Sequence, residues 1–205
     1  MVSTSDWFAT EFEGRPLMAI LRGFDAERSV GLATAAWDLG IEAVEVPVQS
    51  VATLAALAAV VEAGRLRGHH VGAGTVTTLD LVRQAAAAGA AFTVAPGLDA
   101  EVASASIDAG MPHLPGVSTP SEIQSALRLG LGWVKAFPAS VLGEEWLRAM
   151  RGPFPEVTFV ATGGMDADNA ARFLEAGARV VAVGSALADP DQLPALSRLL
   201  ADHRT

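Results

Sequence analysis

The residue with the most distinctive chemistry in this sequence is a single lysine. The chain has 205 residues and 14 lysines and arginines together, of which only Lys135 is a lysine. It lies between Val134 and Ala136 in the apolar run GWVKAFPAS. A coding bias toward arginine explains the arginines but not the position of this lysine. An amine in an apolar pocket can lose its proton and attack a carbonyl to form a Schiff base, whereas arginine stays protonated.

A second charge lies inside another apolar run, EAVEVPVQS, at Glu45. Schiff-base chemistry needs a group that moves protons during dehydration, proton transfer at carbon and hydrolysis, and Glu45 is the candidate, directly or through a water. The alternative is a structural salt bridge between Glu45 and Lys135, because a buried charge is costly unless it is paired or functional. The charge of Glu45 and its apolar neighbours would push its pKa in opposite directions.

Eight short apolar runs alternate with longer, alanine-rich amphipathic segments. The runs start about 20 to 28 residues apart, which is the spacing of a βα unit, and their length and valine content favour strands. The predicted strands are residues 16–21, 42–48, 70–74, 91–95, 112–116, 132–137, 157–162 and 179–184.

The intervening segments predict helices that end on a glycine before the next strand. The predicted helices and their terminal glycines are residues 27–38 with Gly40, 78–88 with Gly89, 101–109 with Gly110, 118–129 with Gly130, and 166–176 with Gly177.

This alternation predicts an α/β fold, a single (β/α)8 TIM barrel domain over residues 1–205 with a short N-terminal helix at about residues 3–13. That helix would cover the bottom of the barrel or form a subunit contact. An open doubly wound sheet is the alternative, which the lack of a GxGxxG motif after the first strand weakens. In a barrel, the active site lies at the carboxyl ends of the strands.

Several polar side chains fall at these strand ends. Gln49 shares a strand face with Glu45, and Phe137 shares one with Lys135, because side chains alternate along a strand. Arg22, after the first strand, is suited to clamp a carboxylate or phosphate, or to pair on the surface. Thr75, after the third strand, is suited to bind a substrate oxygen or to cap a turn. We expect substrate contacts from Arg22, Gln49, Thr75, Phe137 and Thr162.

Glycines follow the last two predicted strands, in VATGGMDADN and VAVGSAL. Backbone N–H groups at such glycines can approach a phosphate, helped by the N-terminus of a helix. Gly163, Gly164, Gly184 and Ser185 are therefore the predicted phosphate-binding residues.

Composition excludes several other functions. The formal net charge is −9 and the pI about 4.8, which disfavours nucleic acid and anionic membranes as partners. The chain contains no cysteine, and its four histidines form no metal-binding spacing, so we expect neither metal nor cofactor. No apolar run is long enough to span a membrane and no secretory signal is present, which makes the cytoplasm the expected compartment.

Taken together, these motifs resemble the 2-keto-3-deoxy-6-phosphogluconate (KDPG) and 2-keto-3-deoxy-6-phosphogalactonate aldolase family. The matching stretches are ILRG, GIEAVEVPVQS, VGAGTV, VAPGL, LPGVST, WVKAFPAS, TGG and VGS, in the family's order, over about residues 16–188. The resemblance implies a class I aldolase on a barrel, commonly a homotrimer, that acts on a phosphorylated keto acid and pyruvate. It implies Lys135 as the Schiff-base lysine, Glu45 as the acid/base, and the four residues named above around the phosphate.

Two positions give mixed signals about the substrate. Gluconate-type enzymes carry an arginine four residues after the glutamate, where this chain has Gln49, so Arg22 is the substitute contact for the pyruvate carboxylate. Thr162 instead matches the gluconate type, in which a threonine is associated with the C4 hydroxyl. The sequence therefore leaves the C4 configuration open and permits dual specificity.

Two other functions remain as alternatives. The terminal glycines alone would suit another phosphate-binding-barrel enzyme, such as an isomerase or synthase, or a non-catalytic sugar-phosphate-binding protein. The pairing of Lys135 with Glu45 argues against both.

Overall fold

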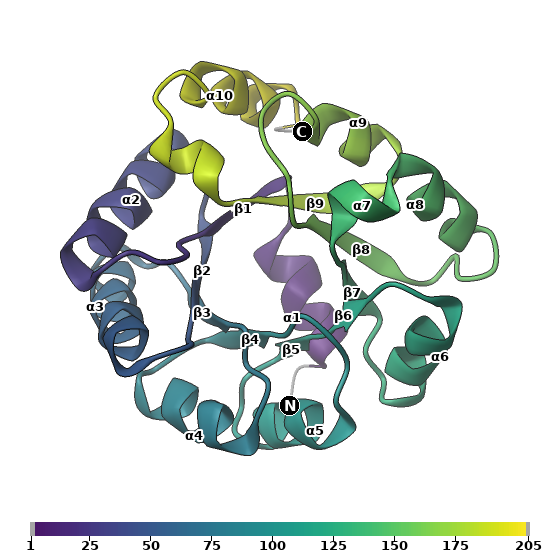
Figure 1. The fold of residues 1–205 in the computed structure, drawn as a ribbon, viewed down its shortest axis with the longest axis horizontal. Coiled ribbons are helices and arrows are strands. Elements are labelled where there is room, and N and C mark those ends of the chain that lie inside the picture. Colours follow the sequence, from purple (N-terminus) through teal and green to yellow (C-terminus); the bar gives the residue numbers. More distant parts are fainter. Residues whose placement is uncertain (1–2, 204–205) are drawn as a thin grey trace.

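The computed structural model describes residues 3–203, and within them nine parallel strands form one nearly closed sheet. The strands form a ring at the centre of the molecule, with helices around the outside (Figure 1). The strand order is β5-β4-β3-β2-β1-β9-β8-β7-β6. The strands are β1 (Leu17–Ile20), β2 (Ala43–Pro47), β3 (Val71–Gly74), β4 (Phe92–Val94), β5 (His113–Leu114), β6 (Gly116–Val117), β7 (Trp133–Ala136), β8 (Thr158–Thr162) and β9 (Ala178–Val183).

The helices alternate with these strands, as the sequence predicts. They are α1 (Thr4–Glu11), α2 (Ala26–Leu39), α3 (Val51–Arg67), α4 (Leu79–Ala87), α5 (Ala100–Asp108), α6 (Pro120–Arg128), α7 (Ala139–Leu142), α8 (Glu144–Arg151), α9 (Ala170–Glu175), the 3-10 helix η1 (Ser185–Ala188) and α10 (Leu193–Asp202). The five glycines predicted as helix ends all have positive φ, a conformation that glycine adopts without strain. The predicted helix 166–176 is shorter in the structure, because a turn precedes α9.

The two edge strands of the sheet, β5 and β6, are separated in the chain by Pro115 alone. β5 pairs with β4, and β6 pairs with β7. Proline has no N–H to donate to a ladder, but its carbonyl still accepts a hydrogen bond of 2.8 Å from the Lys135 N–H. The predicted strand 112–116 is thus two short strands that bring the ends of the sheet together.

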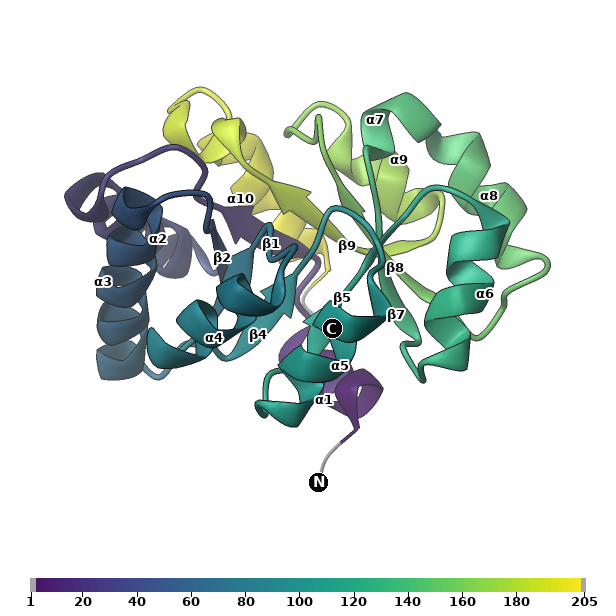
Figure 2. The same ribbon diagram turned by 60° about the horizontal axis from the view of Figure 1, so that its bottom comes forward.

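Two apolar layers result from the alternation of side chains along the strands. One lies between the strands and the surrounding helices, and the other fills the inside of the ring. The inner layer includes Phe8 and Phe12 of α1, which pack against Trp133. Because Ser5 of α1 accepts a hydrogen bond from the N–H of Gly132, just before β7, α1 closes the amino end of the ring (Figure 2). The opposite end, where the strands finish, stays open for a site.

His113 is a buried histidine that faces the outer layer rather than the inside of the ring. It is fully buried, and its Nδ1 lies 2.7 Å from the Thr93 hydroxyl, which in turn contacts Ser106 of α5 at 2.6 Å. Burial lowers the pKa of His113 from 6.5 to about 4, and the negative charge of Asp99 opposes this shift. His113 is therefore a neutral packing residue at pH 7.

We expect the free energy of unfolding to fall as the pH falls from about 6.5 to about 4, because His113 binds a proton in the unfolded chain but not in the native protein. The loss of stability from this residue is on the order of 3 kcal/mol. Above the pKa of His113 in the unfolded chain, the residue costs no stability. His113→Asn retains a partner for Thr93 but does not titrate. Urea unfolding at pH 7 and pH 4.5 should show a smaller pH effect for this variant, and equal effects in the two proteins would contradict the assignment.

Candidate active site

A cavity of about 460 Å³ opens where β1, β8 and β9 end. This is the carboxyl end of the strands, where the sequence placed the site. The lining residues are Ile20, Arg22, Phe24, Phe137, Thr162, Gly163, Gly164, Met165, Asp166, Ala182, Gly184 and Ser185. Seven of these are predicted substrate- or phosphate-binding residues. The predicted strands 16–21, 132–137, 157–162 and 179–184 therefore end at one cavity.

Lys135 lies on β7 and is only 2% exposed. Its Nζ is 4.9 Å from the centre of the Phe137 ring, and Phe137 lines the cavity. An ammonium above an aromatic face is attracted by the ring quadrupole. Lys135 is not itself among the lining residues, so its contact with Phe137 is what connects it to the cavity.

Glu45 lies on β2 and is fully buried. Its carboxyl group packs against Gly74 on β3, where an added methyl group would lie 3.0 Å from the Glu45 carboxyl carbon. Glycine at this position therefore provides the space for the carboxyl. Neither carboxyl oxygen has a hydrogen-bond partner among the described residues. Buried polar atoms are normally paired, so these oxygens are available to a ligand or a water.

Burial sets the protonation of both groups. Desolvation raises the pKa of Glu45, and the positive charges of Lys135 and Arg22 oppose the rise. Desolvation also lowers the pKa of Lys135, which the charge of Glu45 opposes and that of Arg22 assists. Both shifts favour the neutral forms, an amine with a free lone pair and a carboxyl that carries a proton. The sequence left open which influence on Glu45 is larger, and in the structure it is desolvation.

A structural salt bridge does not account for the pair. Within residues 3–203, no ion pair of 4.0 Å or less joins Glu45 and Lys135. The inside of a barrel thus holds an acid and an amine that do not neutralise each other by contact. This arrangement costs stability and leaves two reactive groups inside the ring, neither of them among the residues that line the cavity.

Thr162 and Arg22 supply further polar groups on the cavity wall. Thr162 is 1% exposed, and its hydroxyl oxygen has no partner among the described residues. Arg22 follows β1, is exposed, and forms no ion pair within the part of the chain that the structure describes. It therefore presents an unpaired guanidinium to the cavity.

The predicted phosphate-binding residues line the same cavity. Gly163 and Gly164 have φ of 96° and 72°, and an added methyl group at Gly164 would lie 2.2 Å from the Ser140 hydroxyl. The N–H groups of Gly164 and Met165 donate no hydrogen bond to any residue in 3–203. Free N–H groups on glycine-rich backbone can hold an anion. Ser185 begins η1, so its N–H has no partner within that helix.

Two predicted substrate residues lie outside the cavity lining. Gln49 is exposed beyond the end of β2, with its N–H bonded to the Thr53 hydroxyl. Thr75 is half-buried and has φ of 60°, a strained value for a β-branched residue. Val71 and Ala73 on the same face belong to the outer layer, so alternation alone would turn Thr75 away from the inside of the ring.

Sequence reasoning missed five lining residues. Two of them, Ile20 and Ala182, lie on β1 and β9, and the other three are Phe24, Met165 and Asp166. The last three lie in loops after a strand rather than at its end, where alternation no longer assigns a face. Their proximity to Arg22 and to the GG dipeptide is the only signal that the sequence offers. Within residues 3–203, no group of three or more metal-ligating side chains comes together, and no helix is long and apolar enough to cross a bilayer.

A buried amine and a buried carboxyl inside a parallel barrel, with a cavity at the carboxyl ends of the strands, are what a lysine-dependent, class I aldolase requires. A family model described as KDPG and KHG aldolase matches residues 10–198. The chain belongs to this family.

Named relatives cover most of the chain. A probable 2-dehydro-3-deoxy-6-phosphogalactonate aldolase from Rhizobium meliloti is 35% identical over 177 residues, which are 86% of this chain and 83% of that protein. A 2-dehydro-3-deoxy-phosphogluconate aldolase from Treponema pallidum is 37% identical over 167 residues, with 81% and 78% covered. The structure of a KDPG aldolase from Legionella pneumophila holds pyruvate as a covalent carbinolamine. It has a TM-score of 0.82 and 27% identity, with 96% and 98% covered.

Proposed function

We propose that this protein cleaves a 2-keto-3-deoxy-6-phospho sugar acid reversibly to pyruvate and glyceraldehyde 3-phosphate, with Lys135 as the Schiff-base lysine. The observation that carries the proposal is the burial of Lys135 and Glu45 inside the ring without an ion pair between them, together with a cavity that has free backbone N–H groups. Relatives named for both the gluconate and the galactonate compound support the substrate class.

The reaction begins with Lys135 as the amine and Glu45 as the protonated acid, the forms that burial favours. The Lys135 amine attacks the C2 ketone, and Glu45 gives its proton to the departing hydroxyl, so that water leaves and an iminium forms. The resulting Glu45 carboxylate takes the proton of the C4 hydroxyl as the C3–C4 bond breaks. The electron pair of that bond moves into the iminium and gives an enamine. Glu45 then protonates C3, and water hydrolyses the iminium to release pyruvate.

The remaining cavity residues bind the other end of the substrate. Gly163, Gly164, Gly184 and Ser185 hold the phosphate through backbone N–H groups, and Arg22 contacts an anionic group. The protein carries a net charge of −9, so this local site, rather than the overall field, must attract an anionic substrate. Gln49 and Thr75 remain proposed contacts on the opposite rim, where closure of the loops after β2 and β3 would be needed to reach the substrate. Neither metal nor cofactor takes part.

Reductive trapping tests the proposal. The protein is incubated with pyruvate and borohydride, and the adduct is located by mass spectrometry. Because Lys135 is the only lysine, an adduct on a lysine side chain is expected there alone. A protein that turns over the phospho sugar acid without forming this adduct would belong to the alternative, a different enzyme on a phosphate-binding barrel.

Thr162→Val should separate the two C4 epimers. The variant retains the shape of the side chain and loses the hydroxyl that has no protein partner. We expect kcat/KM for the gluconate-type substrate to fall by about tenfold, the value of one hydrogen bond, and that for the galactonate type to change less. Pyruvate release from both epimers under identical conditions measures this. Equal losses on both would contradict a C4 contact.

The fold, on this proposal, is a (β/α)8 barrel and a single domain over residues 1–205. β5 and β6 count as one strand interrupted by Pro115, which gives eight βα units, and α1 is the cover of the amino end.

A homotrimer is the assembly that we propose. Three aliphatic side chains are largely exposed, Val51 at 86% and Leu66 at 71% on α3 and Val141 at 79% on α7, and a subunit contact would cover such groups. Sedimentation analysis would distinguish a trimer from a monomer.

The cytoplasm is the proposed compartment, because a phosphorylated substrate does not cross a bilayer and is processed where it is made. Cell fractionation tests this placement.

A further inference from the structure

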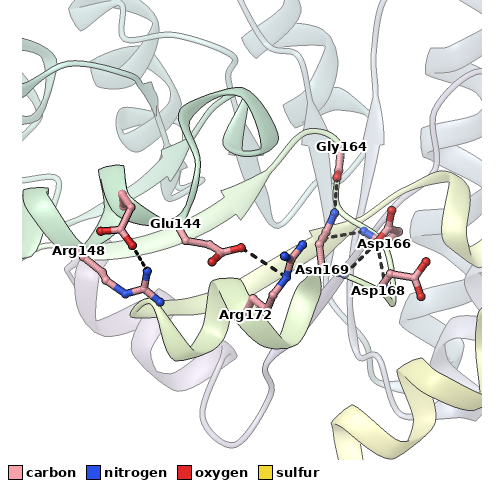
Figure 3. Close-up of polar contacts among 8 residues, drawn as sticks. Glu144, Arg148, Gly164, Asp166, Asp168, Asn169 and Arg172 are labelled. Carbon is pink, nitrogen blue, oxygen red and sulfur yellow. Dashed lines mark hydrogen bonds and ion pairs between the residues drawn. The ribbon is translucent and has the colours of Figure 1, made fainter.

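The loop that joins β8 to α9 carries the two glycines of the proposed phosphate site and ends at Asn169. The Asn169 amide binds this loop at two points (Figure 3). Its Nδ2 donates to the Gly164 carbonyl at 2.9 Å, and its Oδ1 accepts from the Asp166 N–H at 3.2 Å. The two bonds lie on either side of Met165, so one side chain fixes the peptide units before and after that residue.

A carboxamide is well suited to this pair of contacts. It offers a donor and an acceptor on one planar group, whereas a carboxylate only accepts. Asn169 is the only asparagine in the sequence, just as Lys135 is the only lysine. In a chain that uses asparagine once, the residue occupies the position where both halves of the amide are engaged.

These contacts set the direction of the free N–H groups. In a trans peptide, the carbonyl and the N–H point in opposite directions, so a Gly164 carbonyl held toward Asn169 directs the Met165 N–H away from it. Gly164 and Met165 both line the cavity. Gly163 and Gly164 have positive φ and no side chain to restrict them, so an external contact has to hold their conformation.

A further contact joins this loop to the segment between η1 and α10. The Oε1 of Gln192, which follows η1, accepts from the Ala167 N–H at 2.9 Å. Helix α9 is anchored in turn by an ion pair of 3.4 Å between Arg172 and Glu144 of α8 (Figure 3). Asn169 therefore lies between a fixed helix and the loop that lines the cavity.

We propose that Asn169 is the positioning residue of the phosphate site, which holds the Gly164–Asp166 backbone so that the unbonded Met165 N–H faces the anion. This rests on the proposed function, since it requires that the cavity binds a phosphate group.

The test separates the phosphate end of the cavity from the lysine end. Asn169→Asp retains the acceptor and size but loses the donor to Gly164, and Asn169→Ala loses both contacts. Thr78→Ala is the matched control, because it removes a helix-capping hydrogen bond from α4 outside the cavity lining. For each protein we would measure KM and kcat with the phosphorylated substrate, competitive inhibition by inorganic phosphate, and the pyruvate concentration needed for half-maximal borohydride trapping.

Both Asn169 variants are expected to raise KM and the phosphate inhibition constant by about tenfold, the value of one oriented hydrogen bond. Their kcat and the pyruvate dependence of trapping should stay within twofold of wild type, as should all parameters of Thr78→Ala. Unchanged phosphate inhibition in the Asn169 variants would overturn the proposal. So would an equal loss at the pyruvate end, because that loss indicates general disruption. If wild type itself is not inhibited by phosphate, the proposed phosphate site fails, and this inference fails with it.

Discussion

Replacing Lys135 with arginine is expected to abolish aldol cleavage, with a loss in kcat of more than about 10⁴-fold. Arginine preserves the positive charge inside the barrel but cannot act as an amine nucleophile at neutral pH. A lysine whose role was to compensate the charge of Glu45 would tolerate this exchange. A lysine that forms a Schiff base would not, so the conservative substitution is the more informative one.

The loss should appear in both turnover and trapping. Lys135→Arg is expected to show no pyruvate adduct on intact-protein mass spectrometry after borohydride reduction, whereas wild type gains one. Lys135→Met, which removes the charge, distinguishes the chemical from the electrostatic role, because both variants should be equally inactive. Activity within a factor of ten of wild type in Lys135→Arg would rule out the Schiff base.

The same two groups show why so much of the site was predictable from the sequence. Lys135 and Glu45 are charges within apolar strands, and strand alternation assigns them to the inside of the ring once a barrel is assumed. Glycines at the ends of neighbouring strands fall together for the same geometric reason. Position along a strand therefore carries enough information to place a residue at the cavity.

That information ends where the strand ends. Gln49 follows β2, and there Ser50 and Thr53 form a capping box that turns the chain into α3. The alternation that placed Gln49 beside Glu45 does not extend through this turn, and the side chain is exposed. At Thr75, a positive φ breaks the alternation in the same way. Loop contacts such as that of Asn169 with Gly164 depend on tertiary packing that no local pattern encodes.

The fold was also predictable from local sequence patterns, except where one strand is divided. The period of strand and helix, with a glycine at each helix end, indicates a parallel barrel directly. The split of one strand at Pro115 was not anticipated, because the run PHLPG has the length of one short strand and only the missing N–H of proline divides its ladder.

Glu45→Gln is expected to lower kcat by about 10²- to 10⁴-fold, the usual contribution of a general acid/base, and to leave the fold as stable as wild type. Both carboxyl oxygens lack hydrogen-bond partners among the described residues, so the amide loses no protein contact. Burial of an unpaired acidic group stabilises nothing, and its replacement by a neutral isostere should keep the unfolding midpoint at or above that of wild type.

Glu11 is a matched control for this substitution, since it is a second buried glutamate, 7% exposed, and outside the cavity. Its carboxylate lies 2.7 Å from His70 Nδ1, a contact between α1 and the start of β3. Glu11→Gln should lower the free energy of unfolding by up to about 1 kcal/mol and leave kcat unchanged. Steady-state kinetics and urea unfolding on both variants would show opposite patterns. Glu45→Gln should lose activity and keep its stability, whereas Glu11→Gln should lose stability and keep its activity. A Glu45→Gln protein that is both less stable and fully active would mean that the carboxyl is structural, and the proton transfers of the aldol reaction would then have to be assigned to another group.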